Sequence, residues 1–109
     1  MTEGKALEPP PDAVRLAASG PGKGSHSAFF AGGMLVVDWY DHGEDVPFEM
    51  VSQLLFDAEG QRRLLGEESG GAESEVLNAL ARRFDSYWSV EQHCHAAGIG
   101  YAKVTDFDV

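Results

Sequence analysis

Apolar and polar residues alternate with a period of two in the first half of the chain, which predicts β-strands. The clearest alternation covers residues 46–56, and its apolar face consists of Phe48, Met50, Leu54 and Phe56. Residues 34–37 are continuously apolar, as is typical of a central strand, and lie within a longer strand predicted over residues 27–40. A shorter strand is predicted over residues 12–18.

Glycine-containing segments separate these strands. The Gly32-Gly33 pair interrupts residues 27–40 and indicates either a bulge or a tight turn. Residues 41–45 include Gly43 and predict the turn of a hairpin between residues 27–40 and 46–56. We expect this hairpin to have one face on the core. If its turn lies near Gly43, Asp38 and Glu49 come close to each other across the two strands.

The second half of the chain shows helical spacing. Residues 57–65 predict a short helix that begins after Asp57 as N-cap and ends at Gly66. Residues 72–97 are helical, with an apolar stripe that Trp88 continues: Val76, Leu77, Leu80 and Phe84. Asp85 and Ser86 indicate a break into two helices, and Gly98 is a natural end.

A last strand is predicted over residues 100–109, where Tyr101, Lys103, Thr105 and Phe107 alternate with their neighbours. We therefore predict an α+β protein. Its architecture is a two-layer sandwich, in which an antiparallel sheet of three to four strands carries one long or two shorter helices on one face. Residues 12–109 form this single domain. Residues 1–11, which end in three prolines, form a flexible tail.

The charge balance narrows the choice of partner. The 109 residues include 18 Asp and Glu against 8 Lys and Arg, a formal net charge of −10. Such a chain repels nucleic acid and anionic membranes and attracts a basic protein, although the same acidity also serves solubility. Residues 1–11 lack the apolar core of a signal peptide, and one cysteine forms no internal disulfide, so we expect a cytoplasmic protein.

The acidic residues gather around the predicted hairpin. No Lys or Arg occurs between Lys23 and Arg62, whereas two aromatic residues occur among the acids. Clustered carboxylates with Tyr and Trp indicate a protein interface, with Trp39 or Tyr40 as its anchor. The alternative is a solvated hairpin with Trp39 in the core. The candidate partner-binding residues are Asp38, Trp39, Tyr40, Asp41, Glu44, Asp45 and Glu49.

The histidines and the cysteine do not form a recognisable reactive site. His93 and His95 point to different faces of a helix, and neither lies four residues from another His or Cys. Cys94 is adjacent to both, without a third residue to orient a Cys-His pair. The glycine-rich segment 19–25 lacks the ending of a phosphate-binding loop. We therefore predict no catalytic residues, no metal site and no cofactor.

Three segments carry a resemblance: VVDWYDHGEDVPFE, QLLFDAEGQRRLL and KVTDFDV. With them, residues 12–109 resemble small acidic bacterial proteins, some of which look like immunity proteins that neutralise toxins delivered between competing cells. The similarity is one of size, acidity and element order. It implies a stoichiometric inhibitor that covers the basic active site of a toxin, often a nuclease, and it assigns no individual contact residue.

Three hypotheses about function follow. The first is a non-enzymatic protein-binding module of the immunity type, whose acidic hairpin enters a basic site. The second is a homo-oligomer, such as a homodimer, in which residues 101–109 or the strand from Val46 pair with a second copy. The third is a small-molecule- or metal-binding domain, with His42 or His93 lining a pocket.

Overall fold

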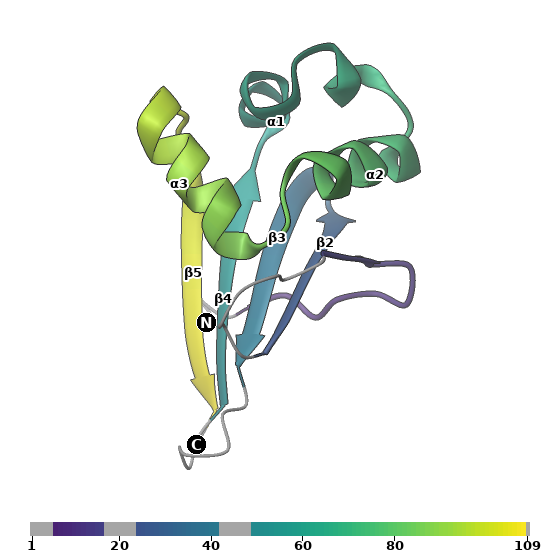
Figure 1. Cartoon of the computed structure of the whole chain (residues 1–109). Coiled ribbons are helices and arrows are strands. Elements are labelled where there is room, and N and C mark those ends of the chain that lie inside the picture. The colour runs from purple at the N-terminus through teal and green to yellow at the C-terminus, as the bar shows by residue number, and fades with distance from the viewer. Residues whose placement is uncertain (1–5, 17–23, 42–48, 109) are drawn as a thin grey trace.

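The computed structural model describes residues 6–16, 24–41 and 49–108 (Figure 1). Five strands form one antiparallel sheet in the order β1-β2-β3-β4-β5. They are β1 (Val14–Arg15), β2 (Ser25–Ala31), β3 (Met34–Asp41), β4 (Glu49–Phe56) and β5 (Ala102–Asp108). The helices α1 (Ala58–Leu65), α2 (Glu73–Arg83) and α3 (Tyr87–Ala97), with the 3-10 turn η1 (Gly66–Gly70), lie between β4 and β5 in the chain.

The α+β class is confirmed, and the element count is corrected. The sequence predicted three to four strands, and the structure has five because the strand predicted over residues 27–40 is two strands, β2 and β3, joined at Gly32-Gly33. It has three α-helices: α1 lies where a short helix was predicted over residues 57–65, and α2 and α3 are the two shorter helices that follow. The strand predicted over residues 12–18 is reduced to Val14–Arg15 within the described part of the chain.

The Gly32-Gly33 pair is the tight turn of the β2–β3 hairpin rather than a bulge. Both glycines have positive φ, 58° and 82°, and Ala31 pairs directly with Met34. Two consecutive residues with positive φ match the right-handed twist of the strands that they join. The turn therefore fixes the register of the hairpin, in which His26 faces Trp39.

The helix boundaries follow the capping signals in the sequence. Asp57 Oδ1 accepts a hydrogen bond from Gly60 N at 2.8 Å, and α1 ends at Gly66. Ser86 Oγ accepts from Ser89 N at 3.1 Å, which separates α3 from α2. Gly98 ends α3 in the left-handed conformation. Each cap satisfies backbone groups that a helix end leaves unpaired, so these predicted boundaries are confirmed.

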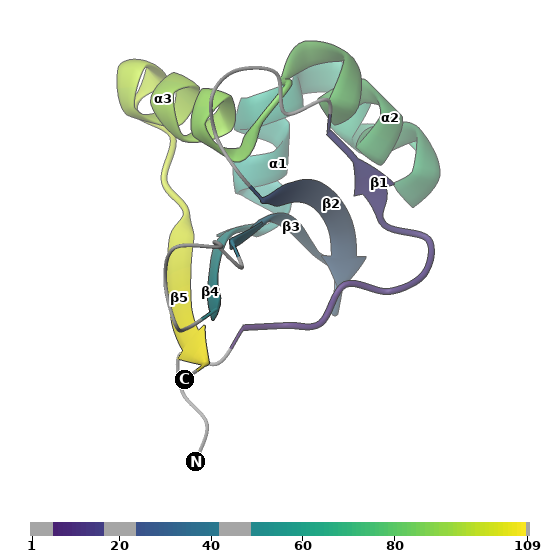
Figure 2. The ribbon, with the colours of Figure 1, turned by 60° about the horizontal axis from the view of Figure 1, so that its bottom comes forward.

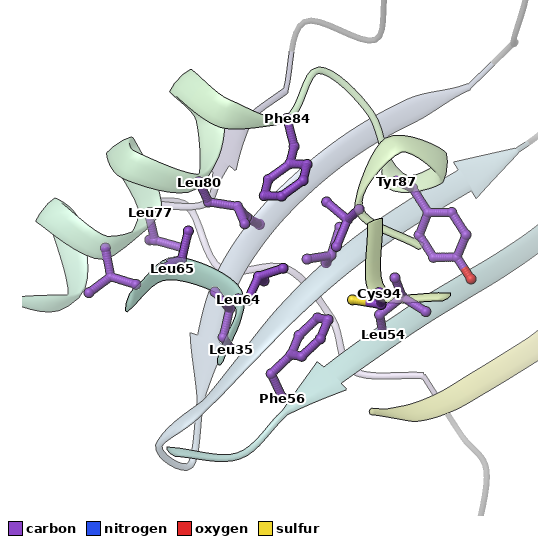
Figure 3. Packing of buried hydrophobic residues seen from close by; sticks show 14 of the residues in the cluster. Leu35, Leu54, Phe56, Leu64, Leu65, Leu77, Leu80, Phe84, Tyr87 and Cys94 are labelled. Carbon is purple, nitrogen blue, oxygen red and sulfur yellow. The ribbon is translucent and has the colours of Figure 1, made fainter. Parts of the chain in front are cut away.

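The helices cover one face of the sheet, which we call the helix face (Figures 1 and 2). Side chains from β3 and β4 meet those of all three helices in a buried apolar core (Figure 3), whose members include Leu35, Val37, Leu54, Phe56, Leu64, Leu80, Val90 and Cys94. The predicted alternation along β4 is therefore confirmed for Leu54 and Phe56. No helix in the described ranges is long and apolar enough to cross a membrane.

The opposite face of the sheet is crossed by residues 6–13, which we call the strap (Figure 2). Leu7 N donates to Gln53 Oε1 at 2.9 Å, and Gln53 Nε2 donates to Leu7 O at 2.7 Å. Ala6 N donates to Asp106 Oδ2 at 3.3 Å. The prediction of a tail over residues 1–11 did not foresee these contacts. Residues 1–5 of that tail lie outside the described residues.

Candidate functional site

Four ring side chains meet on the helix face: His26, Trp39, Tyr87 and Trp88, here called the aromatic cluster. The β2–β3 register places His26 beside Trp39, and the start of α3 brings Tyr87 and Trp88 over them. The ring centroids of Trp39 and Trp88 are 4.8 Å apart, and the ring planes are inclined by 58°. The His26 and Trp88 centroids are 5.0 Å apart, in an edge-on arrangement. Such distances are typical of favourable aromatic pairs.

His26 is the most deeply buried member of this cluster, and its side chain is 1% exposed. Its Nδ1 accepts a hydrogen bond from Tyr87 N at 2.9 Å, so it satisfies an amide that the first turn of α3 leaves without a helical partner. A ring nitrogen that accepts a hydrogen bond carries no proton. Burial lowers the pKa of His26, and the nearby Asp85 charge partly opposes this effect. The imidazole is therefore neutral at neutral pH.

Tyr87, on the other side of the cluster, connects α3 to the sheet by hydrogen bonds. Its hydroxyl shares a 2.8 Å hydrogen bond with Ser52 Oγ, which lies 3.2 Å from Thr105 Oγ1. Burial raises the pKa of Tyr87 above its usual value, so the phenol stays protonated at neutral pH. These bonds and the His26 bond hold the first turn of α3 at two points. The positions of Trp39 and Trp88 are consequently fixed by buried contacts beneath them.

Trp39 and Trp88 themselves are only half-buried, although both pack against the core. They present aromatic surface at the end of β3 where the acidic segment of the sequence, residues 41–45, begins. The alternative that placed Trp39 in the core is thus correct for part of its ring. Part of each tryptophan side chain remains in contact with solvent.

Asp38 does not lie where the interface hypothesis placed it. Its side chain points to the strap face, is 2% exposed, and accepts a hydrogen bond from Gln53 Nε2 at 2.7 Å. Burial raises the pKa of Asp38, and the bond from Gln53 partly opposes this. Asp38 pairs across the hairpin with Gln53, not with Glu49. The expected approach of Asp38 and Glu49 is therefore wrong, because the β3–β4 register is not centred on Gly43.

The other predicted contact residues are dispersed or lie outside the described part. Tyr40 is half-buried and lies on the strap face, opposite to Trp39. Asp41 ends β3 and pairs with Met50, and Glu49 begins β4 and pairs with Asp108 on β5. Glu44 and Asp45 lie outside the described residues, as does His42, which the pocket hypothesis used. Among the predicted acidic residues, the structure places the side chain of Asp38 on the face of the sheet opposite to the aromatic cluster.

The residues around Cys94 serve the packing of α3. Cys94 is buried, and burial raises its pKa to about 11, so the thiol is protonated at neutral pH and is a poor nucleophile. His93 and His95 are exposed, and His95 Nε2 lies 2.9 Å from the Tyr101 hydroxyl. Among the described residues there is no group of three or more side chains placed to hold a metal ion.

A hollow of about 410 Å³ lies at the opposite end of the sheet, where β4, α1 and the approach to β5 meet. Its charged lining residues are Asp57, Glu59 and Arg63. Asp57 already caps α1, and Glu59 Oε2 lies 3.5 Å from a guanidinium nitrogen of Arg63. These charged side chains therefore already have partners within the chain.

Comparison with known proteins adds no assignment: no family model matches the chain, and no curated protein or solved structure shows significant similarity to it. The candidate site therefore rests on its own geometry. Sequence reasoning did not assign His26 or Trp88 to it. The signal was present, because a two-residue turn at Gly32-Gly33 places His26 opposite Trp39, and the Ser86 cap places Trp88 in the first turn of a helix.

Proposed function

We propose that this protein is a binding module for another protein, and that it acts as an immunity-type inhibitor covering a basic site on a bacterial toxin. The observation that carries the proposal is the half-exposed pair of Trp39 and Trp88 on a buried, hydrogen-bonded support. Tryptophan is among the residues that contribute most at protein interfaces, above all where the scaffold holds it in place.

Charge supports a basic partner. The net charge is −10, and the sequence from Ser25 to Gln61, which contains Trp39, has no Lys or Arg. Long-range attraction would speed the encounter, and the tryptophans would then slow dissociation. In this proposal the carboxylates that attract the basic partner are those of Asp41, Glu44, Asp45 and Glu49. Tyr40 lies at the edge of the interface. Asp38 is assigned a structural role beneath the strap.

The test begins with a partner captured from the native cell and purified. Asp41→Lys with Glu44→Lys is expected to slow association by about tenfold at low salt and to flatten its salt dependence. Glu73→Lys with Glu75→Lys, at the start of α2, changes the net charge equally and is the matched control. Equal association rates for the two double variants would reject the acidic segment as the steering surface.

The anchor is tested separately. Trp88→Ala is expected to weaken partner binding by about 30-fold or more, mainly through faster dissociation, because interface tryptophans often contribute 2 kcal/mol or more. Tyr101→Ala removes a half-buried aromatic ring beside Phe56, at a distance from the aromatic cluster, and serves as control. Unchanged affinity of a folded Trp88→Ala variant would reject the aromatic cluster as the interface.

A second candidate is a homodimer, favoured by the position of β5 at the end of the strand order. Edge strands offer backbone groups that pair readily with another strand. Val104→Pro would remove a backbone amide hydrogen from this strand. The mass in solution, measured by light scattering, reports the oligomeric state directly. A monomeric mass at a concentration of roughly 100 µM, the upper range of Kd for a weak dimer, would reject this candidate.

A further inference from the structure

We propose that the sheet face beneath the strap is a binding site for an extended polypeptide segment. The strap occupies this site as a ligand from the same chain, and an uncharged or basic segment of another protein displaces it. The site lies on the face of the sheet opposite to the aromatic cluster, so it is separate from the interface proposed above (Figure 2). Two of its polar groups are the carboxamide of Gln53 and the carboxylate of Asp106.

The Gln53 carboxamide binds the backbone of the strap rather than a side chain. Its Oε1 accepts a hydrogen bond from Leu7 N at 2.9 Å, and its Nε2 donates to Leu7 O at 2.7 Å. Nε2 also donates to Asp38 Oδ1 at 2.7 Å, so that carboxylate fixes the orientation of the amide. One buried side chain thus supplies both partners that an extended residue requires. Every residue except proline offers the same two backbone groups.

The side chains of the strap are held less firmly than its backbone. None of residues 6–13, all of which the structure describes, is buried, and Leu7 is 40% exposed. The hydrogen bonds of Leu7, and the one from Ala6 N to Asp106 Oδ2 at 3.3 Å, use backbone atoms of the strap. Recognition of this kind depends little on the sequence of the bound segment. A segment with few buried contacts also opens at low free energy, so another segment can replace it.

The prolines of the strap favour an extended conformation. Pro9, Pro10 and Pro11 lack backbone donors and favour the polyproline II conformation, so this part of the strap needs few hydrogen bonds to the sheet. Ala13 N donates to Pro10 O at 3.1 Å where the strap turns toward β1. The site therefore accepts an extended backbone whose hydrogen bonds to the sheet lie at its first two residues.

Charge decides which segment suits the site best. The strap contains Glu8 and Asp12 and no basic residue, although the chain already has a net charge of −10. An uncharged or basic segment therefore meets less repulsion than the strap does. A second copy of the chain would bring the same acidic strap and another net charge of −10, which opposes an exchange of straps between copies. The favoured occupant is thus a segment of another protein.

The experiment measures the binding of a synthetic peptide to the full chain, labelled with ¹⁵N. The peptide has the sequence of residues 6–13 with Glu8→Gln and Asp12→Asn, and its ends are blocked. The matched ligand is its ester analogue, in which an oxygen replaces the nitrogen at the position of Leu7 and removes that hydrogen-bond donor. The side-chain amide signals of Gln53 report the site. We expect the peptide to bind about fivefold more tightly than the ester.

Variants of the chain test the competition between strap and peptide. Leu7→Pro removes the amide hydrogen that Gln53 accepts from the strap and leaves the site unchanged. We expect this variant to bind the peptide about fivefold more tightly than wild type, because the site is open in a larger fraction of molecules. Leu7→Ala keeps the amide and shortens an exposed side chain, so its affinity should match that of wild type. Gln53→Leu should abolish the preference for the peptide over the ester.

Three results would overturn the inference. They are equal Kd values for peptide and ester with the Leu7→Pro chain, equal affinities of wild type and Leu7→Pro for the peptide, and no saturable binding to Leu7→Pro up to roughly 10 mM peptide. A dimeric mass in solution that Leu7→Pro reduces to that of a monomer would assign the site to the strap of a second copy instead. These variants leave Trp39 and Trp88 unchanged, so the outcome is independent of the test of the helix face.

Discussion

The two faces of the sheet are both buried, but they are covered in different ways. On the helix face, apolar side chains such as Leu54 and Phe56 pack against three helices (Figure 3). On the strap face, Phe29 and Val36 are equally buried, yet the strap is a single extended segment (Figure 2). The covering of this second face depends on the buried amide of Gln53, whereas the helix face combines a large apolar core with hydrogen bonds such as those of Tyr87.

The difference reflects what each covering element requires. A helix satisfies most of its backbone groups internally and offers an apolar stripe, so apolar burial supplies much of what holds it against the sheet. An extended segment has unpaired amide and carbonyl groups that need partners when they approach a sheet. Gln53 supplies both for Leu7, and its remaining hydrogen bond goes to Asp38. Polar residues are therefore necessary beneath the strap.

The largest expected effect is on the free energy of unfolding, and it is obtained by comparing substitutions of two phenylalanines. Phe56→Ala on the helix face is expected to lower the free energy of unfolding by about 3–5 kcal/mol, because three packed helices cannot fill the cavity. Phe29→Ala on the strap face removes an equally buried ring, 1% exposed against 0%, but should cost less because the strap can move inward. Urea unfolding measures both. Equal losses would show that the strap is as rigid as the helix layer.

A smaller effect is expected from Gln53→Ala. This change leaves the Leu7 backbone and the Asp38 carboxylate without their partner and should cost about 2 kcal/mol. Gln92→Ala, at an exposed position of α3, is the control and should stay within about 0.5 kcal/mol. Hydrogen exchange at the Leu7 amide reports the strap directly. Unchanged protection of that amide in Gln53→Ala would contradict the role given to the side chain.

The pH dependence of the stability that His26 contributes is a test of the packing on the helix face. Burial lowers its pKa below the ordinary 6.5, so the unfolded chain takes up a proton at higher pH than the folded chain does. The stability that this residue contributes is present above pH 6.5 and is lost as the pH falls through its lowered pKa. We expect the stability difference between wild type and His26→Asn to shrink on acidification. His93→Asn, at an exposed site, is the matched substitution for comparison.

The pH dependence of Asp38 tests the strap face and has the opposite sign. Burial raises its pKa above the ordinary 3.8, so the folded chain takes up the proton first as the pH falls. Relative to Asp38→Asn, wild type should therefore gain stability on acidification through the window between the raised pKa and 3.8. Of the four expected effects on stability, this one should be the smallest, since the hydrogen bond from Gln53 opposes the rise in the pKa of Asp38. A loss of stability across this window would contradict the burial of a charged carboxylate.

The sequence predicted those features that depend on local chemistry. The Gly32-Gly33 turn, the Asp57 and Ser86 caps and the end at Gly98 each depend on a few neighbouring residues, and all are found. The strap was not predicted, because Gln53 and Leu7 are distant in sequence and a polar residue in a strand suggests an exposed face. The burial of Asp38 was missed for the same reason.

The candidate site was predicted in part. Trp39 was identified from its acidic neighbours, and it belongs to the aromatic cluster. Trp88 was interpreted as a continuation of the core stripe, since periodicity shows the face of a helix but not how far a large ring extends beyond the core. The expectation for Asp38 and Glu49 depended on the centre of the β3–β4 hairpin, and a displacement of the turn changes every cross-strand pair.

The insertion of three helices between β4 and β5 has a consequence for the order of folding. β2, β3 and β4 follow one another in the chain, whereas β5 reaches β4 only after residues 57–101 have crossed one face of the sheet. Closing so long a connection costs more chain entropy, so we expect β5 to dock late. Because the Ala6 amide binds Asp106 on β5, the strap is completed in that same late event.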